Sequence, residues 1–161
     1  MFRFIRYSVL GLVLALSLTI TGVSYADDGT WSLTDNGYKI WNPCPQPNET
    51  VTWSSGADEE KYATGKGVIQ WFEDGKPVMG YEGDVVKGKA NGKGIATWPD
   101  GDRYEGDFVD GNMTGKGVAT CVSGDRYEGN FINGKMNGYG TYYHSDGTIQ
   151  QGQWENDEFV G

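Results

Sequence analysis

Residues 104–126 read YEGDFVDGNMTGKGVATCVSGDR, and the same pattern recurs 23 residues away on either side. The Tyr-Glu-Gly start of the unit also stands at Tyr81 and at Tyr127, and a degenerate copy begins at Gln150. An earlier copy, residues 65–75, fits only with a short insertion before Tyr81. A fixed period of this size is the signature of an array of repeated structural units, in which terminal repeats tend to be irregular.

Within one unit, apolar and polar residues alternate with a period of two. In residues 103–109 the aromatic rings and the glycine fall on one side and the two acids on the other, which predicts a strand with one wet face. Residues 110–115 predict a turn, and residues 117–122 predict a returning strand. We therefore predict an all-β protein: a single-layer antiparallel ribbon of stacked 23-residue β-hairpins, elongated and twisted.

The elements Tyr-x-Gly-x-Phe/Trp, Gly-x-Gly and Asp-Gly within 23 residues resemble the MORN repeat. The resemblance covers about residues 51–161, and it departs from the pattern at Val85, which replaces the aromatic residue, and at Gln150, which replaces the tyrosine. It implies an elongated sheet of hairpins and, in some members, a groove that holds a peptide or a partner segment. The implied units are about 51–80, 81–103, 104–126, 127–149 and a partial unit 150–161.

The composition disfavours helical folds and most enzyme chemistry. Glycine occupies 26 of the 161 positions, and a glycine inside a helix costs about 1 kcal/mol relative to alanine. With one His and two Cys, the chain lacks a Cys/His zinc set and has little material for a catalytic triad. The acids of one turn, Asp100 and Asp102, leave a calcium site as an alternative, although no EF-hand spacing is present. We predict no enzymatic activity, no cofactor and no metal, with a minor hydrolase as the alternative.

The first 26 residues have the features of a signal peptide. Arg3 and Arg6 precede an uncharged apolar run, residues 9–23, and the small residues Ser24 and Ala26 match a signal-peptidase site. The run is shorter than the ~20 residues of a spanning helix, so we expect cleavage and export, to the periplasm or the medium. The mature chain would carry 11 basic and 22 acidic residues, a net charge of −11. That charge disfavours binding to nucleic acids and to anionic membranes.

Alignment of the units places aromatic side chains in columns, and these columns are the candidate binding site. Aligned rings beside glycines can line a groove that stacks an extended peptide or a sugar ring. They can equally form the core of a sheet that has no second layer. Both interpretations stay open at this point. The candidate groove residues are Tyr81, Tyr104, Tyr127, Phe108, Phe131, Trp98, Trp71 and Trp154.

A leader, residues 27–50, separates the cleavage site from the repeats and contains Trp31 and Trp41. Its aromatic residues predict a strand or flap that caps the first edge of the ribbon. Export would place Cys44 and Cys121 where thiols oxidise. If the leader stays at that edge, the two lie about 19 Å apart, four strand spacings, whereas disulfide Cα atoms come within about 7 Å. A Cys44–Cys121 disulfide is therefore disfavoured unless the leader runs back along the groove.

These observations predict an exported, non-enzymatic repeat protein. We expect it to bind a protein segment along the aromatic and glycine groove, or to act as a scaffold in the cell envelope. A carbohydrate-binding module and a protein associated with phospholipid at a membrane surface are the alternatives. The open edge of the C-terminal unit also allows a homo-oligomer.

Overall fold

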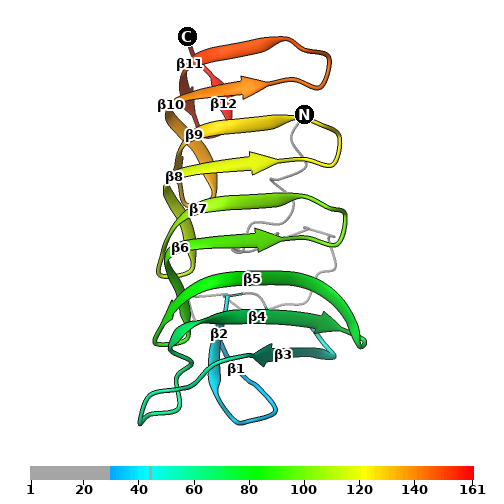
Figure 1. The fold of residues 1–161 in the computed structure, drawn as a ribbon, viewed down its shortest axis with the longest axis vertical. Helices are drawn as coiled ribbons and strands as arrows, with labels where there is room; N and C mark the ends of the chain where they lie inside the picture. The colour runs from blue at the N-terminus through cyan, green and yellow to red at the C-terminus, as the bar shows by residue number, and fades with distance from the viewer. Residues whose placement is uncertain (1–29, 44) are drawn as a thin grey trace, which may run out of the picture.

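The computed structural model describes residues 30–43 and 45–161, which form two antiparallel sheets (Figure 1). A small sheet pairs β1 (Thr30–Leu33) with β2 (Lys39–Asn42). In the main sheet, every strand from β3 to β12 pairs with its neighbours in the chain. Its strands are β3 (Glu49–Trp53), β4 (Gly65–Glu73), β5 (Lys76–Val86), β6 (Lys89–Thr97), β7 (Arg103–Val109), β8 (Asn112–Thr120), β9 (Arg126–Ile132), β10 (Lys135–Tyr143), β11 (Ile149–Glu155) and β12 (Glu158–Phe159). The predicted all-β, single-layer ribbon is confirmed.

Two-residue turns close the hairpins on one side of the ribbon. In the β7–β8 hairpin, Asp110 and Gly111 have φ angles of 50° and 89°. Two consecutive positive φ angles mark the type I′ turn, whose twist matches that of the flanking strands. The sequence predicted a longer turn over residues 110–115, whereas β8 already begins at Asn112. The equivalent turns are Lys87–Gly88, Asn133–Gly134 and Asn156–Asp157.

Gly115, which the sequence placed in that turn, bends strand β8 instead. Its φ is 104°, a left-handed conformation that glycine adopts without a steric penalty. The register with β7 shifts between Gly106 and Phe108, so Gly115 lies in a β-bulge. Gly92 and Gly138 lie at the same shift in β6 and β10. The bulges lie at one level in the hairpins β5–β6, β7–β8 and β9–β10, and Figure 1 shows these hairpins curving away on the side of their two-residue turns.

The core consists of aromatic rings packed on one another and on the glycines of a single face. A Cβ atom at Gly117 would lie 2.5 Å from ring atoms of Tyr104, so only glycine leaves room for that ring. Phe108 lies edge-to-face with Tyr81 at 5.0 Å and with Tyr104 at 5.3 Å between ring centroids, and it thereby joins two successive units. The ladder continues with centroid distances of 5.0 to 5.4 Å through Phe131, Tyr127 and Trp154.

Hydrogen bonds between turns tie each hairpin to the next on both sides of the ribbon. On the side of the two-residue turns, the N–H of Gly111 donates to the carbonyl of Ala90 at 2.8 Å. On the other side, the N–H of Ser145 donates to the Asp125 carboxylate at 2.8 Å. Each unit is thus fixed to its neighbours by the backbone as well as by ring contacts. On the side of the two-residue turns, the first bond recurs from the N–H of Gly134 to the carbonyl of Met113 and from the N–H of Asp157 to the carbonyl of Met136. On the other side, the second bond recurs from the N–H of Val122 to the Asp102 carboxylate.

These carboxylate contacts predict that acid destabilises the protein. The Ser145 N–H lowers the pKa of Asp125, and the Lys93 ammonium lowers that of Asp107. A depressed folded-state pKa gives stability that is present above the unfolded pKa of about 3.9 and is lost as the pH falls through the folded value. Burial raises the pKa of Asp157, and this opposes the trend in part.

We expect the melting temperature, followed by circular dichroism, to fall between pH 5 and pH 3. The fall should be smaller in an Asp125→Asn variant than in the parent protein. Asp74→Asn is the matched control, because Asp74 is an exposed acid in another turn. Equal falls in the parent and in Asp125→Asn would show that the Asp125 contact carries none of the acid sensitivity.

The leader hairpin packs against the aromatic face and does not extend the main sheet, whose edge strand is β3. The N–H of Trp41 donates to the carbonyl of Gly88 at 2.9 Å, and that of Ala63 donates to the carbonyl of Lys39 at 3.1 Å. Between these contacts Ile40 enters the core and is 1% exposed. The leader therefore covers the rings of the first hairpins at the β5–β6 turn.

Some sequence predictions fall outside the described residues or take a different form. The proposed signal peptide, residues 1–26, and Cys44 lie outside them, and so does the proposed Cys44–Cys121 disulfide. The insertion before Tyr81 lies within the sheet, because residues 76–79 belong to β5 and lengthen the β4–β5 hairpin. The predicted boundary between leader and repeats at residue 50 falls within β3.

Candidate binding groove

The structure brings the predicted aromatic ladder together, but it buries the rings. The ring of Tyr104 is covered by its neighbours, and its hydroxyl donates to the backbone carbonyl of Asp107 at 3.2 Å. Burial, with a smaller contribution from Asp107, raises the pKa of Tyr104, so this hydroxyl stays neutral. The ladder packs as a core, and direct ligand binding by these rings stays a prediction. Exposure is 9% or less for Tyr81, Tyr104, Tyr127, Phe108, Phe131, Trp98, Trp71 and Trp154.

An open groove of about 910 Å³ lies on the face opposite the rings. Its floor is a row of paired glycines on six neighbouring strands of the main sheet, β5 to β10. Because the rings cover these glycines on the core face, the groove meets only their backbone. The row consists of Gly83, Gly94, Gly106, Gly117, Gly129 and Gly140.

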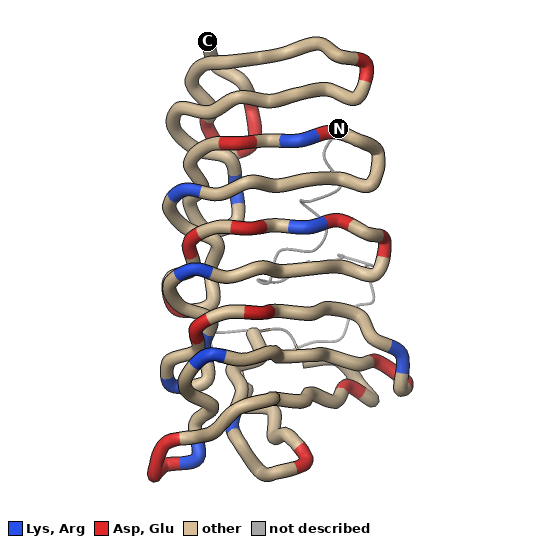
Figure 2. Tube along the Cα trace, viewed as in Figure 1, with Lys and Arg blue, Asp and Glu red and all other residues tan. Residues whose placement is uncertain are grey.

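Side chains of opposite charge line the two sides of this floor. One side carries the acidic row, defined as Glu82, Glu105 and Glu128, on β5, β7 and β9. The other side carries the basic row, defined as Lys66, Lys93 and Lys116, on β4, β6 and β8. Figure 2 shows acids stacked along the middle of the ribbon, and it shows basic and acidic positions alternating on the other side, where Lys66 lies across from Asp84 and Lys93 across from Asp107. The intervening strands place Ile95 and Val118 between the acids, and Thr141 follows Glu128 on β10.

The charges of the groove are exposed and only partly paired. Arg103 holds Glu105 at 2.6 Å, and Lys93 holds Asp107 at 2.6 Å. Exposed pairs of this kind contribute little stability, roughly 0 to 1 kcal/mol, so a ligand can replace them at small cost. Among the described residues, Glu82 has no ion-pair partner, because Gly80 stands where the next two units carry arginine. The acidic row therefore offers carboxylates to a cationic ligand.

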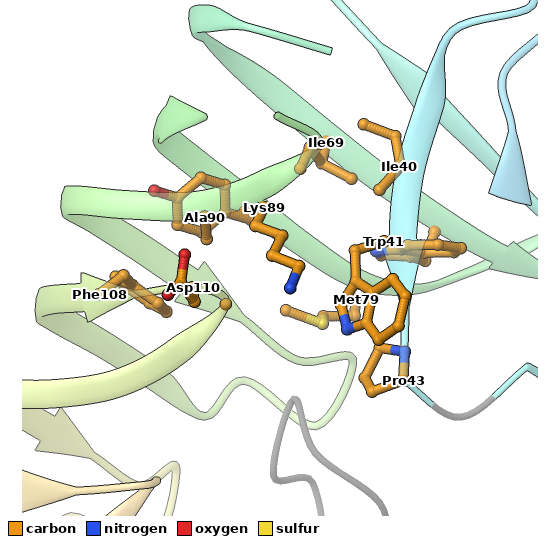
Figure 3. A pocket seen from close by; sticks show the side chains of 13 residues that line it. Ile40, Trp41, Pro43, Ile69, Met79, Lys89, Ala90, Phe108 and Asp110 are labelled. Carbon is orange, nitrogen blue, oxygen red and sulfur yellow. The ribbon is translucent and has the colours of Figure 1, made fainter. Parts of the chain in front are cut away.

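A second, smaller hollow lies between the leader and the aromatic face (Figure 3). Trp41 and Pro43 of the leader stand on one side, and Met79 and Phe108 of the main sheet line it from the other. Lys89 reaches into it, with its ammonium 4.7 Å from the Trp41 ring centroid. The volume is about 40 Å³, room for about three water molecules and too little for a sugar ring.

Cys121 and His144 do not form a catalytic pair. They occupy the same position in successive units, two strand spacings or about 9.6 Å apart. Burial, with a smaller contribution from Asp102, raises the pKa of the Cys121 thiol to about 12, so it is not an activated nucleophile. The His144 ring hydrogen-bonds Gln150 at 2.9 Å. The arrangement supports packing of the turns and offers no base to a nucleophile.

Within residues 30–43 and 45–161, no three His, Cys, Asp or Glu side chains gather closely enough to hold a metal ion. In the same ranges, no helix is sufficiently long and apolar to traverse a bilayer.

Three consecutive matches to the family model described as MORN repeat cover residues 81–103, 104–126 and 127–149. The chain belongs to the MORN-repeat family. No curated protein matches the chain. The matched MORN repeats are the units centred on the hairpins β5–β6, β7–β8 and β9–β10. MORN repeats are in general non-enzymatic binding repeats, so membership indicates a repeat protein that binds proteins or membranes.

The sequence placed the candidate groove on the aromatic face, because the charged side of each strand has the pattern of a solvated surface, with an acidic row for a basic partner only as the alternative. The alternation that placed Tyr104 on one face also placed Glu105 and, across the sheet, Val118 on the other. The signal for the groove was therefore present in the columns of Glu and of branched residues. Tyr139 and Tyr143, which line its far end, break the charge pattern and gave no signal.

Proposed function

We propose that the chain is an exported, non-enzymatic binding protein that holds an extended segment of a partner protein in the groove opposite the aromatic core. The observation that carries the proposal is the open groove of about 910 Å³. It runs over successive repeats and is bordered by the acidic and basic rows. The binding surface thereby moves from the aromatic face, where the sequence placed it, to the opposite face, because the rings are buried.

The groove favours an extended polymer over a small molecule. It is shallow and continuous, and it crosses the strands β4 to β10, whereas small-molecule sites are concave pockets that bury most of their ligand. Its two charged rows suit a chain that carries both basic and acidic groups, as a peptide does. A neutral glycan carries no charge that complements either row, so the groove supports the peptide better than the sugar.

Export and self-association complete the proposal. The N-terminal region 1–26 has the charge and apolar pattern of a signal peptide, and N-terminal sequencing of the exported chain should find Asp27 first. A chain that retains Met1 outside the cell would contradict cleavage.

A homo-oligomer through the β12 edge is also proposed. Sedimentation that shows a monomer at all concentrations would contradict it.

Capture of partners by matched variants tests the groove. The groove variant carries Glu82→Gln, Glu105→Gln and Glu128→Gln, and the control variant carries Glu59→Gln, Glu60→Gln and Glu155→Gln, which remove equal charge at exposed sites elsewhere. After circular dichroism has shown both variants to be folded, each is used in pull-downs from cell-envelope extracts. We expect a protein that the parent and the control capture to be reduced at least ten-fold with the groove variant. A partner that the groove variant captures equally well would contradict the groove as the binding surface.

A further inference from the structure

We propose that the groove selects a polyproline II segment in which a basic residue and an acidic residue each recur at every third position, separated by a proline or a small residue. This inference rests on the proposed function of the groove and names its ligand class.

The repeat distance of the groove fits this conformation. Along the ribbon, Glu82 is followed across the sheet by Ile95 and then by Glu105, so the acids recur at every second strand. Two strand spacings are about 9.4 to 9.8 Å. A polyproline II helix rises 3.1 Å per residue with three residues per turn, so its side chains recur every ~9.3 Å. An extended strand repeats every ~6.7 Å and an α-helix every ~5.4 Å, and neither keeps step with the hairpins.

The two charged rows fit the three faces of such a helix. Glu105 and Asp107 stand on either side of Gly106 on one strand, and their Cα atoms are about 6.7 Å apart. Lys93 pairs with Asp107 across the sheet at 2.6 Å, and Lys66 lies across from Asp84. Lysines therefore alternate with aspartates on the far side of the groove, and they recur at every second strand, as the acids of the acidic row do. One ligand face therefore meets the acidic row, the second meets lysines that alternate with aspartates, and the third lies on the glycine floor, where a proline or a small residue fits.

The floor offers no backbone groups for strand addition. Gly94, Gly106 and Gly117 are paired on both edges within the main sheet. A ligand that must hydrogen-bond through its own backbone finds no partner there. A polyproline II segment has no internal hydrogen bonds and keeps its backbone solvated, and its stiffness reduces the entropy lost on binding. The groove can contact a ligand only through side chains, and a polyproline II segment presents its side chains without needing backbone hydrogen bonds.

The length of the groove sets the length of the probe. From β4 to β10 the lining residues cross six strand spacings, which is about 29 Å. Nine residues of polyproline II span about 28 Å. The probe is therefore the fluorescein-labelled peptide (Lys-Pro-Glu)₃, in which the proline favours the extended conformation of the residue before it. Its comparison peptide has the same composition in blocks, Lys₃-Pro₃-Glu₃.

Fluorescence anisotropy with the full chain tests the period. We expect (Lys-Pro-Glu)₃ to bind at least ten-fold more tightly than the block peptide. We also expect the groove variant to lose this preference while the control variant keeps it. Equal binding of both peptides, or a preference that the groove variant retains, would overturn the three-residue period.

The outcomes separate this inference from the proposed function. If the peptides do not bind, but envelope partners are captured by the parent and lost by the groove variant, the groove binds a segment of another conformation. The inference then fails and the proposed function stands. If the groove variant loses neither the partners nor the peptide, both fail. Added salt should weaken peptide binding, because the contacts are between exposed charges.

Discussion

Replacing Phe108 with alanine should lower the free energy of unfolding by about 4 kcal/mol, the range found for buried phenylalanines. The ring is 2% exposed and touches Tyr81 and Tyr104 of two successive units. Its loss leaves a cavity in a ladder that has no second layer to fill it. Urea denaturation followed by circular dichroism measures the change.

The matched control for this substitution is the next residue along the strand. Val109 is 51% exposed, and Val109→Ala should change the free energy of unfolding by no more than about 0.5 kcal/mol. If Phe108→Ala costs no more than Val109→Ala, the ring is not a core element. The aromatic face would then return as the candidate binding surface.

Gly106→Ala should destabilise the protein by about 3 kcal/mol, at the upper end of the cost of overpacking. A Cβ atom there would lie 2.6 Å from the Cα of Gly117 and 2.6 Å from the carbonyl oxygen of Lys116. Both are backbone atoms of the paired strand, so no side-chain rotation relieves the clash. Thermal and urea denaturation of the purified variant measure the loss.

The same glycine-to-alanine substitution at Gly56 should have the opposite effect on stability. Nothing lies within 4 Å of a Cβ atom at Gly56. An alanine there restricts the unfolded chain and should stabilise the protein by about 0.5 kcal/mol. If Gly106→Ala and Gly56→Ala were equally stable, the close approach of Gly106 to Gly117 across β7 and β8 would be contradicted.

The strands were the most predictable part of the fold. The alternation in residues 103–109 predicted β7 with the bounds that the structure shows, because the period of two reports directly on a strand with one covered face. The start of β8 was not predictable in the same way. Gly115 is compatible with a turn or with a bulge, and the choice depends on its pairing with β7, which the local sequence does not specify.

The columns of the candidate site were predictable, but the use of each face was not. The repeat period places Tyr104 and Tyr127 in one column and Glu105 and Glu128 in another. It does not reveal that the Tyr104 ring packs flat against Gly117 and so covers the face of the sheet on which it lies. Ile40 of the leader also covers part of the aromatic face. This contact joins segments that are distant in the sequence, so no local pattern predicts it. The open face therefore became clear only from the packing.

Photo-cross-linking shows whether a partner lies in the groove opposite the rings. A photoreactive phenylalanine analogue replaces Val118 in the groove or, as the control, Val122, which is 73% exposed on a turn outside it. Each protein is irradiated with envelope extract, and the cross-linked peptides are identified by mass spectrometry. We predict cross-links to a contiguous segment of one partner from position 118 and none from position 122. Cross-links from position 122 alone, with the partner bound, would contradict the account.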